Sequence, residues 1–210
     1  MNAAPSIRID NLWFQLGGRT LFKALSADMH PGVHWIRGPN GVGKTTLLKL
    51  LVGAIQPSSG SILHCNSSIT DLSLAQRQQL FFCGDDIPDL AWLSAGELLS
   101  VYQSIYPALH FGRLQHFMAL FRLDAVARTP ARSLSLGERK KLLLAIAFSL
   151  DVSVLLLDEP FNALDACARD MVQQLLLDRS AAKHQIIAVT SHLEPQAVDQ
   201  VIDLERSDSL

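Results

Sequence analysis

The sequence predicts an α/β domain with a mostly parallel β-sheet, an antiparallel β lead-in and a helical insert. Short apolar segments with strand character alternate with segments of helical periodicity, which is the pattern of a parallel sheet covered on both faces. A glycine-rich segment stands between a strand and a helix near residue 40, and two adjacent acids follow another apolar strand near residue 158. Both features follow strands, so a ligand site is expected at the carboxyl edge of the sheet.

The elements are predicted in chain order. Partial alternation of apolar residues, the glycine pair Gly17-Gly18 and a second strand-like run predict an antiparallel hairpin before the first parallel strand. From residue 94 to 123 the apolar residues recur at helical intervals, which predicts the insert. The predicted strands are 7–12, 21–29, 33–37, 61–64, 80–83, 152–157 and 185–190. The predicted helices outside the insert are 46–52, 72–80, 138–150 and 166–177.

Residues 38–45 fit the pattern G-x-x-x-x-G-K-[ST] of a loop that holds nucleotide phosphates. Its glycines let the main chain turn with the N–H groups pointing inward, and the N-terminus of the next helix extends this anion-binding nest. Lys44 adds a charge that reaches the β- and γ-phosphates, and the Thr45 hydroxyl is placed to ligate the Mg²⁺ that they carry. The residues expected to bind nucleotide here are Gly38, Pro39, Asn40, Gly41, Val42, Gly43, Lys44, Thr45 and Thr46.

The second chemical feature is the acid pair Asp158-Glu159, which follows the apolar run 154–157. In phosphate-loop NTPases a carboxylate at this place binds Mg²⁺, and we assign that role to Asp158. Glu159, one residue further, would orient and polarise the attacking water as general base. A lone Asp-Glu pair is more often a solvated strand end, but the phosphate loop upstream favours the catalytic interpretation.

Residues 134–138, Leu-Ser-Leu-Gly-Glu, lie ahead of the acid pair and resemble the signature motif of ATP-binding cassette (ABC) ATPases. Residues 162–165 resemble the D-loop of that family, and residues 190–192 end a strand at the position of its switch histidine. Other phosphate-loop kinases and GTPases have no such signature. The motifs span residues 38–192, and the resemblance implies the ABC ATPase fold for nearly the whole chain.

The resemblance implies that two cassettes pair head to tail, with each ATP between the phosphate loop of one and the signature of the other. Ser135 and the backbone of Gly137 would donate hydrogen bonds to the γ-phosphate on the opposite subunit. His192 would contact the γ-phosphate and help to order the water with Glu159, while Asp165 would link the two sites across the interface. Taken alone, His192 would more often be an ordinary strand-end histidine, and its place in the series of motifs gives it this role.

Three positions depart from the family pattern. The aromatic residue that stacks on adenine would fall near Leu16, so Trp13 and Phe14 are the candidate substitutes unless they point into the core. Asp86 stands near the place of the Q-loop glutamine, where it is either a ligand of Mg²⁺ or part of a solvated loop. Leu136 replaces a signature glycine, a change that exporter-type cassettes often tolerate. None of these changes removes a catalytic residue, so we expect a competent ATPase.

Composition narrows the class of protein further. The 210 residues carry a formal net charge of −2, so no general attraction to nucleic acid or to an anionic membrane is expected. No apolar run reaches the 18 or more residues of a membrane-spanning helix, so a membrane passage would come from a partner subunit. The three separated cysteines and the lack of a signal-peptide pattern favour a reduced, cytoplasmic protein.

We therefore expect a single ABC ATPase domain over residues 1–210. Its nucleotide-binding α/β core would comprise residues 1–85 and 138–210, and its helical subdomain residues 86–137. The resemblance implies a Mg²⁺-dependent ATP-hydrolysing subunit that powers transport, with export favoured, through a separate integral membrane subunit. The helical insert would dock on that subunit, which implies a peripheral location at the inner face of the cell membrane.

Within the family, chain length and residues 17–22 and 158–165 are loosely similar to the ATPases of haem exporters used in cytochrome c maturation. Two other classes are weighed. A soluble ABC ATPase acting on ribosomes or in DNA repair usually carries two cassettes or a long coiled-coil insertion, and this chain has neither. A phosphate-loop kinase would need a pocket for a phosphate acceptor and would lack the signature.

Overall fold

The computed structural model describes residues 4–84 and 90–205, whose strands form two sheets. One is a four-stranded antiparallel sheet in the order β2-β1-β4-β5, and the other is a five-stranded parallel sheet in the order β6-β7-β8-β3-β9. The strands are β1 (Ile7–Leu16), β2 (Arg19–Met29), β3 (Gly32–Arg37), β4 (Ser59–His64), β5 (Ser67–Ser68), β6 (Leu80–Cys83), β7 (Val154–Asp158), β8 (Ile186–Thr190) and β9 (Gln200–Asp203). The predicted mixture of a parallel sheet and an antiparallel lead-in is confirmed.

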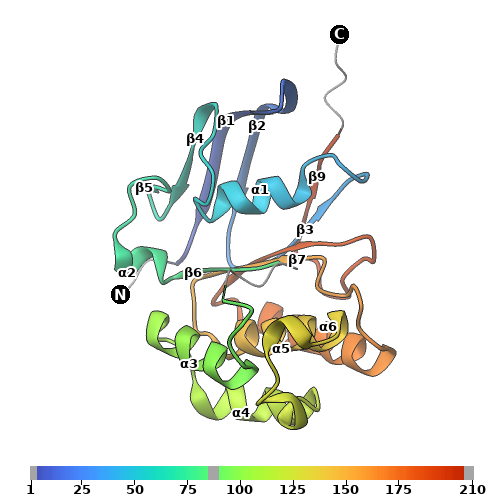
Figure 1. Ribbon diagram of the computed structural model, residues 1–210. Helices are drawn as coiled ribbons and strands as arrows, with labels where there is room; N and C mark the ends of the chain where they lie inside the picture. The colour runs from blue at the N-terminus through green and yellow to red at the C-terminus, as the bar shows by residue number, and fades with distance from the viewer. Residues whose placement is uncertain (1–3, 85–89, 206–210) are drawn as a thin grey trace.

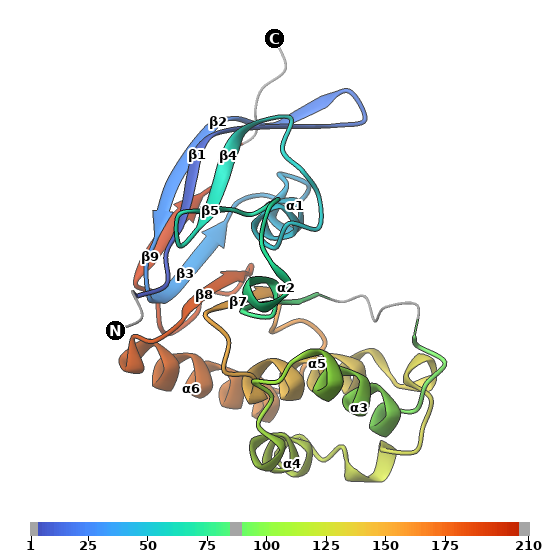
Figure 2. The same ribbon diagram turned by 90° about the vertical axis from the view of Figure 1, so that its left-hand side faces the viewer.

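The helices cover both faces of the parallel sheet. They are α1 (Lys44–Leu51), α2 (Leu74–Arg77), α3 (Ala95–Ile105), α4 (Phe111–Leu120), α5 (Leu136–Ser149) and α6 (Ala166–Ala182), with 3₁₀ turns at Asp124–Val126 and Ala131–Ser133. Figures 1 and 2 show α1 between the two sheets, α3, α5 and α6 on the other side of the parallel sheet, and α4 outermost. Among the described residues, no helix combines the length and apolarity needed to cross a bilayer.

Two hydrophobic cores hold these layers together, one on each face of the parallel sheet. Side chains alternate along a strand, so β7 sends Val154 and Leu156 toward the core around α1, and Leu155 and Leu157 toward the core around α5. These four residues are fully buried. The buried strand thereby fixes where its last residue, Asp158, reaches the sheet edge.

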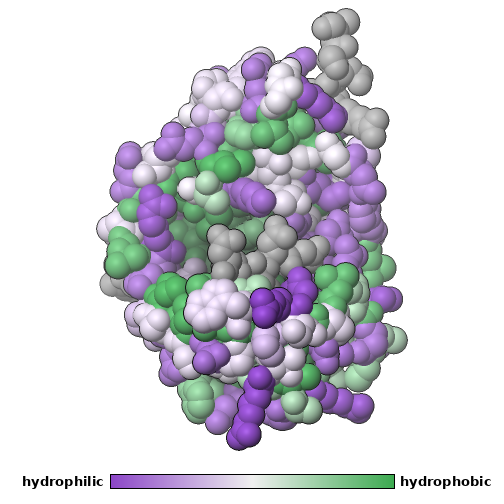
Figure 3. Space-filling model, viewed as in Figure 1, coloured by the Kyte–Doolittle hydropathy of each residue, from purple (hydrophilic) through white to green (hydrophobic). Residues whose placement is uncertain are grey.

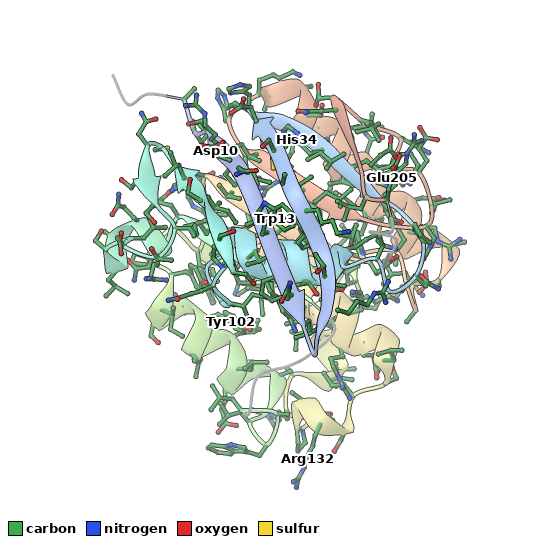
Figure 4. The ribbon with its side chains drawn as sticks, turned by 90° about the horizontal axis from the view of Figure 1, so that it is seen from above. Asp10, Trp13, His34, Tyr102, Arg132 and Glu205 are labelled. Atoms are coloured by element: carbon green, nitrogen blue, oxygen red, sulfur yellow. The ribbon has the colours of Figure 1, made fainter. Side chains whose placement is uncertain are left out.

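The antiparallel sheet begins with a tight hairpin. Gly17 and Gly18 join β1 to β2 with φ of 57° and 82°, the left-handed conformations that a two-residue hairpin turn requires. The turn leaves Leu16 directly opposite Arg19 in the strand register. In Figure 4, which looks down on the outer face of this sheet, Trp13 lies over the strands on the side turned away from α1.

Some element boundaries differ from the sequence prediction. The predicted helix over 72–80 is wrong for most of its length: Ser73 caps a helix that ends at Arg77, and Leu80 already pairs in β6. Strands β5 and β9 were not predicted. Helix α5 begins two residues earlier than expected because Ser135 and Glu138 form a capping box.

The helical insert contains α3 and α4, which pack against α5 in the same hydrophobic core as β7. On the face seen in Figure 3, the surface is hollowed between α1 above and the helices below, with apolar residues at the walls. The boundary assigned between the α/β core and the helical subdomain stays a prediction, and residues 85 and 86 at that boundary lie outside the described residues.

Candidate active site

The phosphate loop leaves β3 and enters α1 at the carboxyl edge of the parallel sheet. Two of its glycines are required by the packing as well as by the backbone. A Cβ at Gly38, whose φ is 153°, would lie 2.5 Å from the Leu204 carbonyl oxygen. A Cβ at Gly43, whose φ is 112°, would lie 2.9 Å from the Phe22 ring. The loop can adopt this backbone conformation because Gly38 and Gly43 have no side chains.

The N-terminus of α1 fits an anionic ligand. Gly43 is the N-cap residue, no side chain among the described residues caps the helix, and no acid lies in the first turn. The first N–H groups of a helix have no partner within the helix and carry the positive end of its dipole. These groups are therefore available to phosphate oxygens.

Lys44 lies at the centre of this loop and is 8% exposed. Its Nζ donates a hydrogen bond to the Gly38 carbonyl at 2.9 Å and lies 3.9 Å from Oε1 of Glu159. The ammonium is thus held inside the loop, beside the carboxylate that the sequence assigns as general base. Of the remaining loop residues, Val42 is buried in the core around α1.

Asp158 is held by two hydroxyl groups. Its Oδ2 accepts a hydrogen bond from Thr45 at 2.7 Å, and its Oδ1 accepts one from Thr190 at 2.5 Å. Thr190 stands directly beside Asp158 because β7 and β8 pair in parallel register at these two residues. The two oxygens predicted to ligate Mg²⁺, on Thr45 and Asp158, are therefore adjacent.

Glu159 follows Asp158 in a left-handed backbone conformation, with φ of 45°. Such a conformation is unfavourable for a residue other than glycine and is often found at functional sites. Its N–H donates to the carbonyl and the hydroxyl of Thr190, at 3.0 and 3.1 Å. Its carboxylate is 16% exposed and lies 3.4 Å from Nε2 of His192. Lys44, Glu159 and His192 are thus brought together, as the sequence predicts.

A pocket of about 680 Å³ lies over these groups. It is bordered by the phosphate loop, by Glu159, Asn162 and His192, and by the hairpin residues Leu16, Arg19 and Leu21. The residues of the loop and α1 that border it are Asn40, Gly41, Gly43, Lys44, Thr45 and Thr46. The lining thus combines the phosphate loop, which suits phosphates, with the apolar side chains of Leu16 and Leu21.

The predicted aromatic substitutes do not reach this pocket. Phe14 is buried beside Phe22, and Trp13 is 37% exposed on the outer face of the antiparallel sheet. The hypothesis that either residue stacks on a base is therefore wrong for this conformation. Leu16, which stands where an aromatic residue was expected, borders the pocket instead and is 60% exposed.

The signature residues lie away from the pocket. Ser135 is exposed at the start of α5, where its Oγ accepts from the Glu138 N–H at 3.2 Å and donates to Oε2 of Glu138 at 2.6 Å. The hydrogen bonds that the hydroxyl and then the main-chain N–H of Ser135 donate to this carboxylate lower the pKa of Glu138. Gly137 sits so close to the next loop that a Cβ would lie 2.8 Å from the Ala163 carbonyl. Leu136 between them is 58% exposed.

Asp165 is the N-cap of α6 and accepts a hydrogen bond from the Ala168 N–H at 2.9 Å. It also pairs with Lys141 of α5 at 2.5 Å, and this bond is the main cause of the lowered pKa of Asp165. Within one chain, neither Asp165 nor the signature residues border the 680 Å³ pocket. Asp86, the remaining predicted metal ligand, lies outside the described residues.

The donor set fits Mg²⁺ held partly by phosphates. Among the described residues, no group of three or more His, Cys, Asp and Glu side chains could hold a metal by itself. Mg²⁺ prefers oxygen ligands, keeps several waters and is commonly bound through one or two protein oxygens plus substrate phosphates. Thr45 and Asp158 supply such oxygens beside the phosphate loop.

A phosphate loop and an acid pair at the carboxyl edge of a parallel sheet define a nucleotide-binding protein of the phosphate-loop class. Residues 22–162 match the family model described as ABC transporter. The chain therefore belongs to the ABC transporter family, as an ATP-binding subunit. The family predicted from the signature motif is confirmed.

Several curated relatives are export ATPases. The cytochrome c biogenesis ATP-binding export protein CcmA of Haemophilus influenzae is 32% identical over 194 residues, which cover 90% of this chain and 89% of that protein. CcmA of Nitrosococcus oceani is 34% identical, covering 90% of this chain and 87% of its own length. The Nod factor export ATP-binding protein I of Ralstonia nicotianae is 28% identical over 92% of this chain and 62% of its own length. The similarity to ATPases of cytochrome c maturation is thus confirmed.

Solved structures agree on the fold. The ATP-binding subunit of an ABC transporter superposes with a TM-score of 0.84 at 21% identity, covering 95% of this chain and 86% of that one. A dimeric ATP-binding cassette bound to ADP and phosphate has a TM-score of 0.80 at 20% identity, with 95% and 94% covered.

Proposed function

We propose that this chain is the Mg²⁺-dependent ATPase of an exporter whose membrane passage is formed by a separate subunit. The observation that carries the proposal is the position of Glu159, between the phosphate-loop lysine and His192 at the pocket. A carboxylate there faces the place where the terminal phosphate of a bound nucleotide would lie. The similarity to CcmA and to the Nod factor export protein supports export as the direction.

In this proposal, different residues of the chain carry out different parts of ATP binding and hydrolysis. The α1 N-terminus and Lys44 bind the β- and γ-phosphates of the substrate ATP. Thr45 and Asp158 hold Mg²⁺, which when bound neutralises phosphate charge. Glu159 accepts the proton of the attacking water, and His192 orients that water and contacts the γ-phosphate. Asp86 would add a further carboxylate ligand to this Mg²⁺.

A second copy completes the site. Ser135 and the first N–H groups of α5 form an exposed helix N-terminus, and the signature residues do not border the 680 Å³ pocket of their own chain. A head-to-tail pair would bring this N-terminus against the ATP in the other copy, with Asp165 at the boundary between the two sites. Removal of the γ-phosphate by hydrolysis would remove the charge that joins the copies.

The membrane subunit would dock at the helical insert, which places the chain at the cytoplasmic face of a membrane. Large apolar side chains are exposed in this region, including Trp92 at 62%, Phe111 at 53% and Ile105 at 45%. Exposed apolar side chains of this kind are typical of surfaces that bind a partner. Purification from membranes tests this docking: a membrane-spanning subunit should accompany the chain.

The ATPase assignment is tested by phosphate release from ATP with and without Mg²⁺. Glu159→Gln keeps the shape of the side chain but removes the base, so we expect turnover to fall by about 10²-fold or more while ATP still binds. Glu205→Gln, the same change at an exposed position, is the matched control. Wild-type turnover in Glu159→Gln would overturn the assignment of the base, and turnover without any divalent cation would overturn the assigned metal role.

A further inference from the structure

Lys140 is a buried lysine in the second turn of α5. Its residue exposure is 3%, and its Nζ donates a hydrogen bond of 2.8 Å to the main-chain carbonyl of Asp158. A buried ammonium is strongly destabilising unless it is well paired, since the cation loses its hydration. The group that the Lys140 ammonium contacts therefore indicates what this lysine does.

The carbonyl that Lys140 contacts belongs to the peptide unit joining Asp158 to Glu159. The N–H at the other side of that peptide unit donates to the carbonyl of Thr190 in β8. The peptide unit is thus fixed from both sides, by α5 through Lys140 and by β8 through Thr190. In Figures 1 and 2, α5 runs along the face of the parallel sheet that is opposite to α1.

This peptide unit sets the direction of the Glu159 side chain. Glu159 has a φ of 45°, a conformation that persists only where the surrounding structure enforces it. If the carbonyl of Asp158 were released, rotation of the peptide unit would let Glu159 relax toward ordinary φ values. Its carboxylate would then leave its place between Lys44 and His192.

We propose that Lys140 is a positioning residue for ATP hydrolysis: it fixes the Asp158–Glu159 peptide unit and so keeps the Glu159 carboxylate in its working position. The proposal rests on the function proposed above, in which Glu159 is the general base. Lys140 does not border the nucleotide pocket, and its Nζ contacts the peptide unit that precedes Glu159.

Lys140→Met tests the proposal, because it keeps the length of the side chain and removes the donor. We expect kcat for ATP to fall by about 10²-fold, the effect of a misplaced catalytic group, while KM for ATP changes less than about 2-fold. The melting temperature is measured as well, and it should fall modestly because the Asp158 carbonyl loses this hydrogen-bond donor. Lys140→Gln, a shorter neutral donor, should restore part of kcat. Lys49→Met on α1 is the matched control.

The outcomes are distinct. Wild-type kcat in Lys140→Met, with Glu159→Gln inactive in the same assay, would overturn the positioning role and leave the base intact. Wild-type turnover in Glu159→Gln would instead overturn the proposed function itself. A loss of kcat that Lys140→Gln does not relieve, accompanied by an equal rise in KM and a lower melting temperature, would show a purely structural lysine. If Lys140→Met does not fold, wild-type kcat in Lys140→Gln together with Lys140→Ala would likewise overturn the proposal.

Discussion

The side chain of Thr190 forms hydrogen bonds with both Asp158 and Glu159 of the candidate site. Its hydroxyl donates to Asp158 and accepts from the main-chain N–H of Glu159, and the residue is fully buried at the end of β8. A buried hydroxyl with two such partners has one orientation, so it fixes the carboxylate of Asp158 relative to the backbone of Glu159. Thr190 therefore holds the two acidic residues of the site in their relative positions.

Thr190→Val should weaken that support without changing the volume of the core. A hydrogen bond to a charged group contributes about 1.5–3 kcal/mol, so we expect the Mg²⁺ concentration for half-maximal ATPase activity to rise by about 10-fold. Titration of ATPase activity with Mg²⁺ measures the effect, and Thr70→Val at an exposed position is the control. An unchanged titration curve in Thr190→Val would contradict the role given to this hydroxyl.

His64 is expected to make folding sensitive to acid. The ring is 4% exposed on β4, and neither ring nitrogen has a hydrogen-bond partner among the described residues. Burial lowers the pKa of His64 below its ordinary value of 6.5. The unfolded chain then binds this proton more readily than the folded chain, so the stability is present above pH 6.5 and is lost as the pH falls from there through the lowered pKa.

Urea unfolding at pH 7.5 and pH 5.5 measures this effect. The wild type should lose unfolding free energy between the two values, and His64→Phe, which fills the same space with a ring that does not titrate, should lose less. Other groups, including His34 with its similarly lowered pKa, contribute equally to both proteins. Equal losses in the two proteins would contradict this account of His64.

Motif reasoning at the residue scale located the groups that carry chemistry. Lys44, Asp158, Glu159 and His192 were predicted, and the structure places all four at one sheet edge. Thr190 enters the sequence motifs only as a neighbour of His192, although the parallel pairing of β7 and β8 brings the last residues of these strands together. The role of Lys140 could not be predicted, since it depends on which helix packs behind β7.

At the scale of elements, the start of α5 is in close contact with the loop between β7 and α6. Gly137 meets the carbonyl of Ala163, and Lys141 pairs with Asp165. The signature helix and the loop that follows the catalytic acids are therefore packed as a single unit. Any side chain at Gly137 has to displace this loop.

Gly137→Ala is expected to lower both stability and ATPase activity, although alanine favours a helix. Its Cβ would lie 2.8 Å from the Ala163 oxygen, and overpacking of this kind destabilises by about 1–3 kcal/mol. Gly112→Ala on α4 is the matched control, because no atom lies within 4 Å of its Cβ and helix propensity should stabilise by about 0.5–1 kcal/mol. Urea unfolding and ATPase rates of both variants decide the matter: an equal gain of stability at both glycines would contradict the contact.

Elements with strong local signals were predicted, and those that depend on tertiary pairing were not. Strand β7 is a continuous apolar run and helix α1 follows an unmistakable loop, so both were placed within two residues. Strand β9 has only two apolar residues, Val201 and Ile202, and exists because it pairs with β3 at the sheet edge. The helical spacing of residues 72–80 was outweighed by burial of Leu80 beside β7.

At the scale of the whole molecule, the site of one chain is open. The 680 Å³ pocket is bordered by the phosphate loop and Glu159, while the exposed N-terminus of α5 lies elsewhere on the same chain. In the proposed function, two copies form the complete sites, each giving its phosphate loop to one ATP and its α5 N-terminus to the other. The antiparallel sheet, the parallel sheet and the helical layer serve to hold these two surfaces at a fixed separation.

Complementation between two defective variants tests this claim most directly. Lys44→Ala removes the phosphate-loop cation, Ser135→Arg blocks the start of α5, and Glu159→Gln is added to both so that ATP is not consumed. A dimer of either variant alone would contain no site with both Lys44 and Ser135 unchanged. A mixed dimer would contain one such site. Light scattering should show both proteins as monomers in Mg-ATP when separate, and a dimer when mixed. A mixture that stays monomeric, or a dimer formed by either variant alone, would contradict the shared site.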